Sequence, residues 1–287
     1  MRWEDVANQI RRSPFYRDRI GEISTPELSR APLTRRADLL RDQLEHLPHG
    51  TRRLPGSTPV RAGVAGSGED LLVLVWSAAE LAAERVAGTR LLRRLGVAPG
   101  MRVANTLPGA LATPGSLLLG DVIEELGGLD VPLGTIESEA SARQAWELVD
   151  RVQPDVLVLD GPALLAATPA APRPWWRGIV WLERPSGPIA AAAGFTGWER
   201  IWLAVPEATS FIAGSCTASR LHVDDRVMAE VVEERTGEVL PPGREGILAL
   251  TLLDGETPLL RYASALRARV DPRPCPCGAA GLVIEVA

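Results

Sequence analysis

Three cysteines and one histidine are spaced so that together they could bind a metal ion. Cys275 and Cys277 form a Cys-Pro-Cys-Gly turn, and Cys216 precedes His222 with five residues between them. Three thiolates and an imidazole make a complete tetrahedral ligand set for zinc. The sequence therefore predicts a zinc site at these four residues. Two alternatives remain open: the cysteines pack as small hydrophobic residues, or two of them form a disulfide, which the odd number disfavours.

The basic residues restrict the chemistry further, because all 31 of them are arginine and the chain has no lysine. A Schiff-base nucleophile and a P-loop lysine are therefore excluded. The net charge of −5 disfavours a nucleic-acid partner. The N-terminus MRWEDVANQI has no apolar core for a signal peptide, and the longest apolar run, 71–83, is too short to span a bilayer. We expect a cytoplasmic protein that binds neither nucleic acid nor membranes.

Short apolar segments alternate with helical patterns between residues 71 and 160. The helix predicted over 77–96 has the clearest ends, with Ser77 as N-cap, Glu80 three residues later and Gly96 as the stop. Residues 58–68 are predicted to be rich in turns. This alternation indicates α/β architecture with a largely parallel sheet. We predict further helices over 113–128 and 138–153, strands over 71–76, 129–134 and 154–160, and a turn and a strand within 98–108.

After about residue 210 the pattern changes to strands of alternating polarity separated by glycine and proline turns, which indicates antiparallel sheet. We therefore divide the chain into an α/β core over 1–210 and a β-rich subdomain over 211–287 that carries the predicted zinc knuckle. The expected fold class is α/β, with parallel-rich sheets and helices plus a smaller antiparallel β-region near the C-terminus.

Several segments of the chain resemble segments of a known family and occur in the same order. SPFYRDRI and PLTRRADL resemble its opening segments, with Arg36 where lysine is usual. RTGEVLPPGREGILALTLLDGETPLLRYASAL resembles its "xTGExLPPGExGELVxTxLxxExxPLxRYRTGD", and CPCG matches the family's own CPCG. On these segments the chain resembles the phenylacetate–CoA ligase branch of the adenylate-forming (acyl-CoA synthetase, AMP-binding) superfamily over about residues 13–280. The resemblance implies the fold of the family's N-terminal domain.

The resemblance also bears on the zinc site. Some family members hold a metal with a cysteine and a histidine that follow the "YGxSE" motif, together with the CPCG pair. Cys216, His222, Cys275 and Cys277 match those positions. The role implied is structural, because four protein ligands leave no open position for a substrate.

The segment that resembles the family's ATP loop departs from its pattern. VRAGVAGSGED keeps Gly66, Ser67 and Gly68 of a loop that the family writes as "VRxSSGTTGxP". Glu69 and Asp70 place two carboxylates beside the expected phosphate site, where they would repel a polyanion. The nucleotide loop is therefore predicted to be degenerate.

Three further departures concern the same chemistry. AVPE keeps Glu207 of the "YGxSE" motif but has no aromatic residue, and Leu266 replaces the aspartate that binds the ribose in "RYRTGD". We also expect the family's mobile C-terminal domain, which carries the adenylation lysine, to be absent, so that the chain is a truncated and degenerate member. We therefore predict that this chain alone does not adenylate a carboxylate, and that neither ATP nor magnesium is its cofactor.

The segments that would form the acyl or aryl pocket suggest which substrate the protein acts on without ATP. The resemblance places the acyl or aryl pocket at segments 105–120 and 182–185, and the first of these is small and apolar, as a hydrophobic ligand requires. We predict ATP-independent chemistry on an apolar acyl or aryl carboxylate or thioester in a biosynthetic pathway, with surface salt bridging as the alternative role for each charged residue. The candidate substrate-binding residues are Asn105, Leu107, Gly109 and Arg184, and the candidate acid–base residues are Glu207 and Glu183.

Two other functions remain open. The chain could be a non-catalytic pseudo-enzyme that scaffolds an intact ligase or a carrier protein, or one part of a split ligase whose C-terminal domain comes from another chain. Family members often dimerise, and the eight tryptophans offer interface anchors, so we expect a homodimer.

Overall fold

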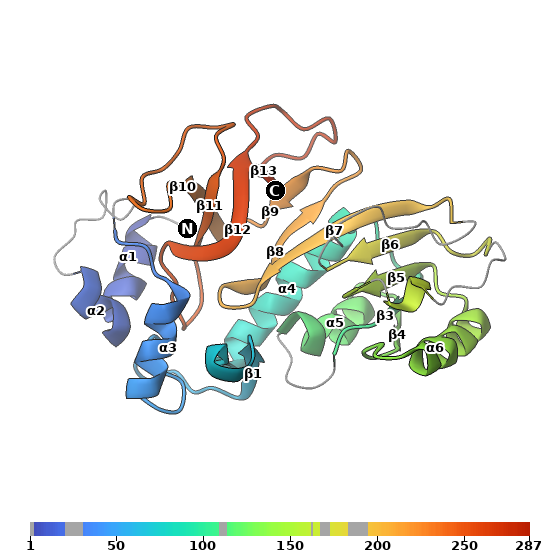
Figure 1. Cartoon of the computed structure of the whole chain (residues 1–287), viewed down its shortest axis with the longest axis horizontal. Coiled ribbons are helices and arrows are strands. Elements are labelled where there is room, and N and C mark those ends of the chain that lie inside the picture. Colours follow the sequence, from blue (N-terminus) through green and yellow to red (C-terminus); the bar gives the residue numbers. More distant parts are fainter. Residues whose placement is uncertain (1–2, 21–30, 109–113, 162, 167–172, 183–194) are drawn as a thin grey trace.

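Eleven strands form one mixed sheet through the centre of the protein (Figure 1). The computed structural model describes residues 3–20, 31–108, 114–161, 163–166, 173–182 and 195–287. The strands run in the order β10-β11-β12-β13-β9-β8-β7-β6-β5-β3-β4. The predicted α/β class, with a parallel part and an antiparallel part, is confirmed.

The parallel part of the sheet is covered by helices on both faces. Alternate residues along β5 (Val156–Leu159) belong to different hydrophobic clusters: Val158 packs with helices α4 (Ala78–Leu95) and α5 (Pro114–Glu125), and Leu157 packs with α6 (Glu139–Val152) and α7 (Ala163–Ala166). Burial on both faces explains why this strand is a continuous apolar run. The other parallel strands are β3 (Arg102–Asn105), β4 (Leu129–Pro132), β6 (Gly178–Trp181) and the first half of β7 (Trp198–Val205).

Helix α4 ends where the sequence predicts. The Ser77 side chain accepts a hydrogen bond from the Glu80 amide, the Glu80 carboxylate reaches back to the Ser77 amide, and Gly96 closes the helix with φ of 96°. This capping box fixes the start of the helix, and glycine takes the left-handed conformation at its end without a Cβ clash.

The antiparallel part continues directly from the parallel part. β7 pairs with β6 in parallel and with β8 (Thr209–Ser215) antiparallel, so the sheet is continuous across residue 210. The division into 1–210 and 211–287 stays a prediction. The remaining antiparallel strands are β9 (Leu221–Val223), β10 (Val227–Val232), β11 (Gly246–Leu252), β12 (Tyr262–Val270) and β13 (Val283–Val286).

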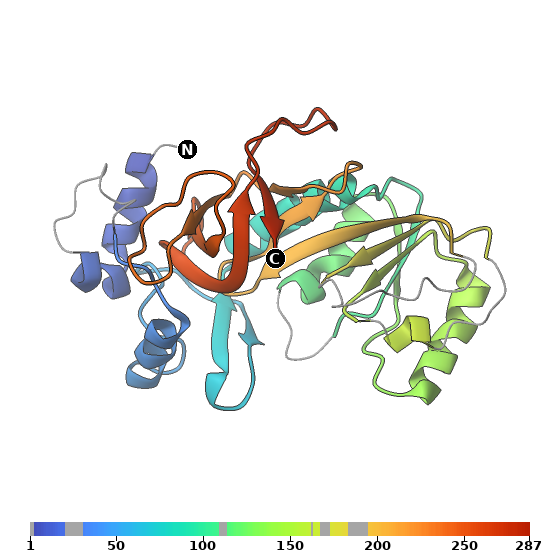
Figure 2. The same ribbon diagram turned by 45° about the horizontal axis from the view of Figure 1, so that its top comes forward.

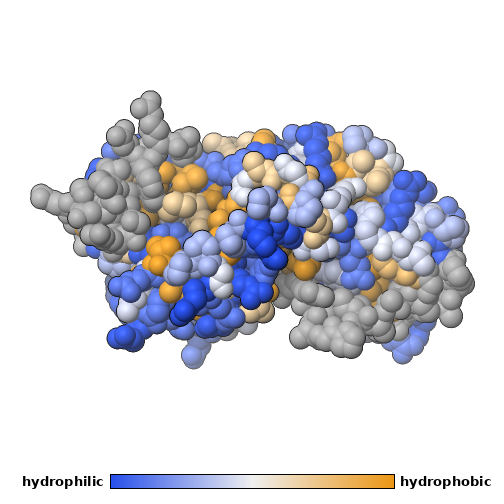
Figure 3. Space-filling view, turned by 90° about the horizontal axis from the view of Figure 1, so that it is seen from above, coloured by the Kyte–Doolittle hydropathy of each residue, from blue (hydrophilic) through white to orange (hydrophobic). Residues whose placement is uncertain are grey.

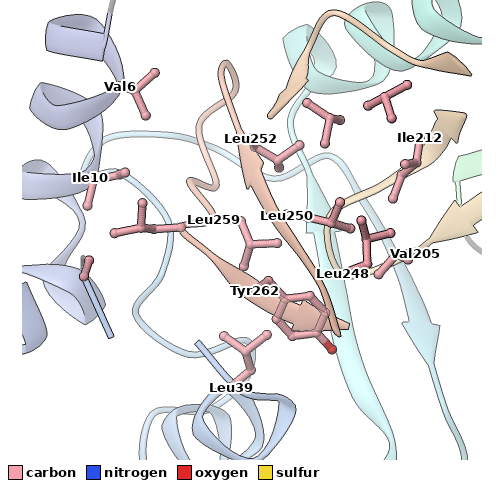
Figure 4. Close-up of a cluster of buried hydrophobic side chains, with 14 of the residues drawn as sticks. Val6, Ile10, Leu39, Val205, Ile212, Leu248, Leu250, Leu252, Leu259 and Tyr262 are labelled. Atoms are coloured by element: carbon pink, nitrogen blue, oxygen red, sulfur yellow. The ribbon is translucent and has the colours of Figure 1, made fainter. Parts of the chain in front are cut away.

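Three N-terminal helices cover this antiparallel part. Val6 and Ile10 of α1 (Trp3–Arg12) and Leu39 of α3 (Arg36–Glu45) belong to the same buried cluster as Leu250 and Tyr262 of the sheet (Figure 4). The short helix α2 (Pro14–Ile20) completes the cover. This packing brings the N-terminal segment beside strands that lie more than 200 positions later in the chain.

A two-stranded hairpin projects from the body near α3 (Figure 2). It consists of β1 (Arg61–Ala65) and β2 (Leu72–Trp76), paired antiparallel from Arg61↔Trp76 to Ala65↔Leu72. The prediction of turns throughout 58–68 is therefore wrong for β1. Its alanine and glycine residues have low strand propensity, and its pairing with the apolar β2 overrides that propensity.

In the part of the chain that the structure describes, no helix is long and apolar enough to cross a membrane. The face of the molecule in Figure 3 carries its apolar residues in several groups separated by polar ones.

Candidate functional site

The fold brings the four predicted metal ligands together at one end of the antiparallel sheet. Cys216 directly follows β8, and His222 lies in the middle of β9. The CPCG turn lies between β12 and β13, and β13 pairs with β9 so that Val283 is opposite His222. The β8–β9 and β9–β13 pairings therefore bring the two halves of the ligand set to the same place.

The distances within the cluster suit a tetrahedral zinc ion. Its four candidate ligand atoms all lie within 4.8 Å of one another. The Sγ atoms of Cys216 and Cys275 are 3.5 Å apart, and Cys277 Sγ lies 3.4 Å from His222 Nε2. Ordinary zinc bond lengths give tetrahedral edges of about 3.8 Å between two sulfurs and about 3.6 Å between sulfur and nitrogen. The chemistry and the spacing of these donors therefore fit zinc.

The surroundings favour the metal-binding forms of these side chains. Cys216 is 4% exposed and His222 is 1% exposed. Burial, with Arg94 and Arg220 nearby, lowers the pKa of His222, so the imidazole is neutral and its nitrogen lone pair is available to a metal. Backbone amides also point at two of the sulfurs, since Ala218 N lies 3.3 Å from Cys216 Sγ and Ala279 N lies 3.5 Å from Cys277 Sγ.

Arg220 holds the CPCG segment against the sheet. Its guanidinium donates to the carbonyl oxygens of Arg273 and Pro274, each at 2.8 Å, and pairs with Asp271 at 2.5 Å. Hydrogen bonds from Arg273, with the charge of Arg220, hold the pKa of Asp271 well below its usual range. Sequence reasoning missed this support, and the only signal for it was the presence of opposite charges beside the ligands.

The candidate nucleotide loop connects β1 to β2, and an arginine from α3 fills it. Gly66 and Gly68 have φ of 79° and 57°, as a tight glycine turn requires. Arg36 Nη2 donates to the carbonyl oxygens of Ala65 at 2.6 Å and of Asp70 at 2.5 Å. The same guanidinium donates through Nη1 to the Glu207 carboxylate. A Cβ on Gly66 would lie 2.4 Å from Arg36 Nη2, which shows how closely the loop surrounds this side chain.

Two carbonyl oxygens of this loop are turned toward a cation. A phosphate-binding loop turns its amide N–H groups toward the ligand. Here two carbonyl oxygens face the guanidinium, and the amides of Asp70 and Leu71 donate within the loop to Ser67 and Gly68. In this conformation the loop binds a cation, and that cation is Arg36.

Glu207 lies in the turn between β7 and β8, where it is 8% exposed. Its carboxylate pairs with Arg36, and its carbonyl oxygen accepts a hydrogen bond from Arg52 at 3.2 Å. Beside it is a cavity of about 480 Å³, between the start of α3, the end of β7 and the first residues of β12. The cavity is lined by Arg35, Arg36, Ala37, Ala204, Val205, Pro206, Glu207, Tyr262, Ala263, Ser264, Ala265 and Leu266.

The candidate substrate residues lie elsewhere. The Asn105 side chain donates to Asp130 at 2.9 Å and accepts from the Leu107 amide at 3.3 Å, so it holds the end of β3. The Leu107 side chain is 4% exposed and packs in the cluster formed by α4, α5 and the sheet. Their role in substrate binding stays a prediction. Gly109, Glu183 and Arg184 lie outside the described residues.

Two buried glutamates of α4, Glu80 and Glu84, line a pocket together with Glu207, and sequence reasoning did not assign them to the site. Glu84 accepts hydrogen bonds from Thr209 at 2.7 Å and from Arg226 at 3.0 Å, and burial raises its pKa despite these partners. Burial also acts to raise the pKa of Glu80, but the Ser77 amide and Arg53 outweigh it and lower that pKa. The spacing of four along a helix was the signal that both carboxylates share a face.

Comparisons with known proteins find similarity to CoA ligases. No family model matches the chain. A phenylacetate-coenzyme A ligase from Thermus thermophilus is 28% identical over 306 aligned positions, which cover 95% of this chain and 65% of that relative. The chain thus spans less than two thirds of the length of the curated relative that it matches.

Solved structures of CoA ligases share the fold of this chain. A 2-hydroxyisobutyryl-CoA ligase, in an open conformation with 2-HIB-AMP and CoA, superposes with a TM-score of 0.84 at 19% identity, over 99% of this chain and 66% of that one. A long-chain-fatty-acid–CoA ligase from Archaeoglobus fulgidus gives a TM-score of 0.60 at 10% identity, over 82% of this chain and 52% of that one. The predicted resemblance to adenylate-forming ligases is confirmed at the level of the fold.

Proposed function

We propose that this chain, which resembles phenylacetate–CoA ligase in sequence and has the N-terminal-domain fold of the adenylate-forming ligases, handles an apolar acyl or aryl acid or its thioester without ATP-dependent activation. The observation that carries this proposal is the position of Arg36 inside the candidate nucleotide loop. The guanidinium takes up two loop carbonyls and the Glu207 carboxylate together, so neither the loop nor Glu207 is available to a nucleotide or its magnesium ion.

The wall of the adjacent cavity supports the same conclusion. Leu266 stands where the resemblance has an aspartate for the ribose hydroxyls, and its half-buried side chain packs against the hydrophobic cluster around Tyr262. An apolar side chain offers no acceptor to a ribose and leaves its hydroxyls desolvated. Each lost donor or charge at a reacting centre typically reduces the rate on the order of 10²–10³. Losing both the loop and the ribose acceptor therefore disfavours adenylation.

The first experiment measures ATP chemistry directly. We expect no heat of ATP binding in calorimetry with magnesium, and no ATP–pyrophosphate exchange with phenylacetate present. ATP binding together with exchange would overturn the proposal. ATP binding without exchange would instead favour the split-ligase alternative, in which another chain supplies the remaining domain.

A second experiment measures thioester chemistry. Phenylacetyl-CoA is incubated with the protein without ATP, and the released thiol is measured with a thiol reagent. We expect turnover that falls in Glu207→Gln, a variant that keeps the size of the side chain but removes the charge that holds Arg36 in place. Binding of phenylacetyl-CoA without any turnover would favour the non-catalytic partner alternative.

We infer that Cys216, His222, Cys275 and Cys277 hold a structural zinc ion. Support comes from the donor set, the near-tetrahedral spacing and the neutral imidazole. Because four protein atoms complete the coordination, the metal would link the β8–β9 turn to the β12–β13 turn and would not contact a substrate. Its contribution is therefore to stability.

A further inference from the structure

Two sulfur atoms of the cysteine and histidine cluster are in contact with each other. Cys216 Sγ and Cys275 Sγ lie 3.5 Å apart, and neither cysteine forms a disulfide in the structure. A disulfide needs an S–S distance of about 2.05 Å, so a movement of about 1.5 Å brings the two atoms to bonding distance. The fold therefore holds two thiol groups that are 59 positions apart in the sequence at a separation that a small movement can close.

Hydrogen bonds that need no metal hold these two cysteines side by side. Cys216 and Arg220 close the turn between β8 and β9, because the Cys216 amide donates to the Arg220 carbonyl oxygen at 3.0 Å. The Arg220 guanidinium donates to the carbonyl oxygens of Arg273 and Pro274, each at 2.8 Å. Pro274 directly precedes Cys275, so the same arginine anchors the segments of both cysteines. The pair therefore stays together when the site holds no metal.

The third sulfur of the cluster has other neighbours. Cys277 Sγ lies 3.4 Å from His222 Nε2 and 3.5 Å from the Ala279 amide nitrogen. Within the described part of the chain, Cys275 Sγ has no hydrogen-bond partner besides the sulfur of Cys216. These contacts favour a bond between Cys216 and Cys275, and they leave Cys277 with the histidine.

The two thiols in contact differ in their exposure. Cys275 is half-buried in the turn between β12 and β13, whereas Cys216 is only 4% exposed. Oxidation of a cysteine follows its accessibility, so a small oxidant reaches Cys275 first. Cys216 is then the thiol in contact with the oxidised sulfur, which is the position of a resolving cysteine.

We propose that Cys216 and Cys275 form a reversible redox pair, which a hydroperoxide oxidises to an intramolecular disulfide. The Cys275 thiolate attacks the peroxide, so that an S–O bond forms and the O–O bond breaks, and the departing alkoxide or hydroxide takes up a proton. The Cys216 thiolate then attacks the resulting sulfenic acid, so that the S–S bond forms and the S–O bond breaks, and the departing hydroxide takes up a proton. The two sulfurs together lose two electrons, and the peroxide gains two.

This oxidation replaces one link between the two turns with another. A disulfide removes two of the four donors proposed for zinc, so the site would release the metal. The new bond still joins the β8–β9 turn to the β12–β13 turn, and a thiol reductant reverses it. The release of metal rests on the proposed zinc site, whereas the disulfide needs only the two sulfurs.

Hydrogen peroxide is the probe that tests the pair. The purified protein is treated with it, thiols are counted with a thiol reagent after unfolding, and released zinc is measured with a chromogenic chelator. We expect the three thiols of the chain to fall to one, with loss of the bound zinc, and dithiothreitol to restore all three. Trypsin separates Cys216 in residues 201–220 from Cys275 and Cys277 in residues 270–287, so mass spectrometry of the joined peptides shows the disulfide.

Two serine variants identify the partner of Cys216. Cys275→Ser and Cys277→Ser each remove one sulfur from the same turn and one donor from the proposed metal site, so they form a matched pair. Both are treated with a chelator before the oxidation, and we expect peroxide to form the disulfide in Cys277→Ser and not in Cys275→Ser. In metal-free wild type, oxidation is expected to raise the urea midpoint of unfolding by about 1 M, because the disulfide closes a loop of roughly 60 residues.

A disulfide that forms in Cys275→Ser but not in Cys277→Ser would overturn the inference. Three unchanged thiols after peroxide treatment would also overturn it, as would oxidised thiols that dithiothreitol does not recover. Disulfides that join two chains, seen as dimers on a non-reducing gel, would show that the pair is not intramolecular and would count against it equally. A disulfide between Cys216 and Cys275 in a protein that binds no zinc would contradict the proposed zinc site and support the redox pair.

Discussion

Replacing Cys275 with serine removes one sulfur from the CPCG turn while changing the side-chain volume little. In the structure this sulfur lies 3.5 Å from Cys216 Sγ, across 59 positions of sequence. A zinc ion shared by the two side chains acts as a cross-link, and the loop-closure relation gives about 4 kcal/mol for a loop of roughly 60 residues. Linkage gives a similar value, since zinc at about 1,000 times its dissociation constant adds about 4 kcal/mol to the free energy of unfolding.

The assay combines metal content with stability. Zinc per chain is measured by mass spectrometry after purification, and urea unfolding is followed by tryptophan fluorescence with zinc and then with a chelator. We expect one zinc ion per wild-type chain and a lower content in Cys275→Ser. The chelator should reduce the wild-type free energy of unfolding by about 4 kcal/mol and should have little effect on the variant.

Ala279→Ser is the control, because it adds a serine to the same turn and removes no sulfur. Its zinc content and stability are expected to match the wild type within about 0.5 kcal/mol, as for most surface changes. The reasoning would be refuted by a wild-type chain that binds no zinc when zinc is supplied. It would also be refuted if the chelator shifted wild type and Cys275→Ser equally.

Two further predictions concern α4. Glu80→Gln is expected to lower the free energy of unfolding by about 3 kcal/mol at pH 7. The reason is that the Glu80 carboxylate accepts hydrogen bonds from Ser77 N at 2.8 Å and from Arg53 at 2.9 Å. Glu69→Gln, at an exposed position, should change the free energy of unfolding little. The pKa of Glu80 is lowered in the folded protein, so its contribution to the free energy of unfolding is present above its ordinary pKa of 4.5. That contribution is lost as the pH falls below 4.5. The urea unfolding curves of the wild type and Glu80→Gln should therefore converge in acid. Gly88→Ala is expected to lower the melting temperature although alanine favours helices, because the new Cβ would lie 2.8 Å from Val122 Cγ2 and 2.9 Å from the Phe211 ring. Val86→Ala, on the exposed side of the same helix, should not lower it, and equal melting temperatures for the two variants would contradict the packing argument.

The sequence predicted well those elements whose ends are determined by neighbouring residues. Ser77, Glu80 and Gly96 fix α4 through short-range hydrogen bonds and a left-handed end, so its bounds could be read from the sequence. β1 could not be predicted in this way, because its strand depends on β2 and on Arg36, which binds the Ala65 carbonyl at its end. The sequence pattern also could not show that β7 joins the parallel and antiparallel parts into one sheet.

The candidate site also has parts that the sequence predicts and parts that it does not. The cysteine and histidine cluster was predictable because each half has a short, chemically specific spacing, and the β9–β13 pairing only had to bring the halves together. The contact between Arg36 and Glu207 joins residues 171 positions apart, and no spacing rule predicts it. The residues of the loop were known from the sequence, but the direction of its carbonyls, two of which face Arg36, was not.

The closure of the loop around Arg36 depends on the shape of the guanidinium. Arginine carries five N–H donors in one plane, and Arg36 uses them for two loop carbonyls and one carboxylate at the same time. A lysine ammonium at this position would have three donors on a compact, strongly hydrated group, and it could leave the carbonyls for a phosphate at a smaller cost in hydrogen bonds. An exchange between lysine and arginine, which has little effect on an exposed surface, therefore changes the hydrogen bonds inside this loop. At position 36, arginine therefore favours the closed loop, in which one guanidinium holds the carbonyls of Ala65 and Asp70 together.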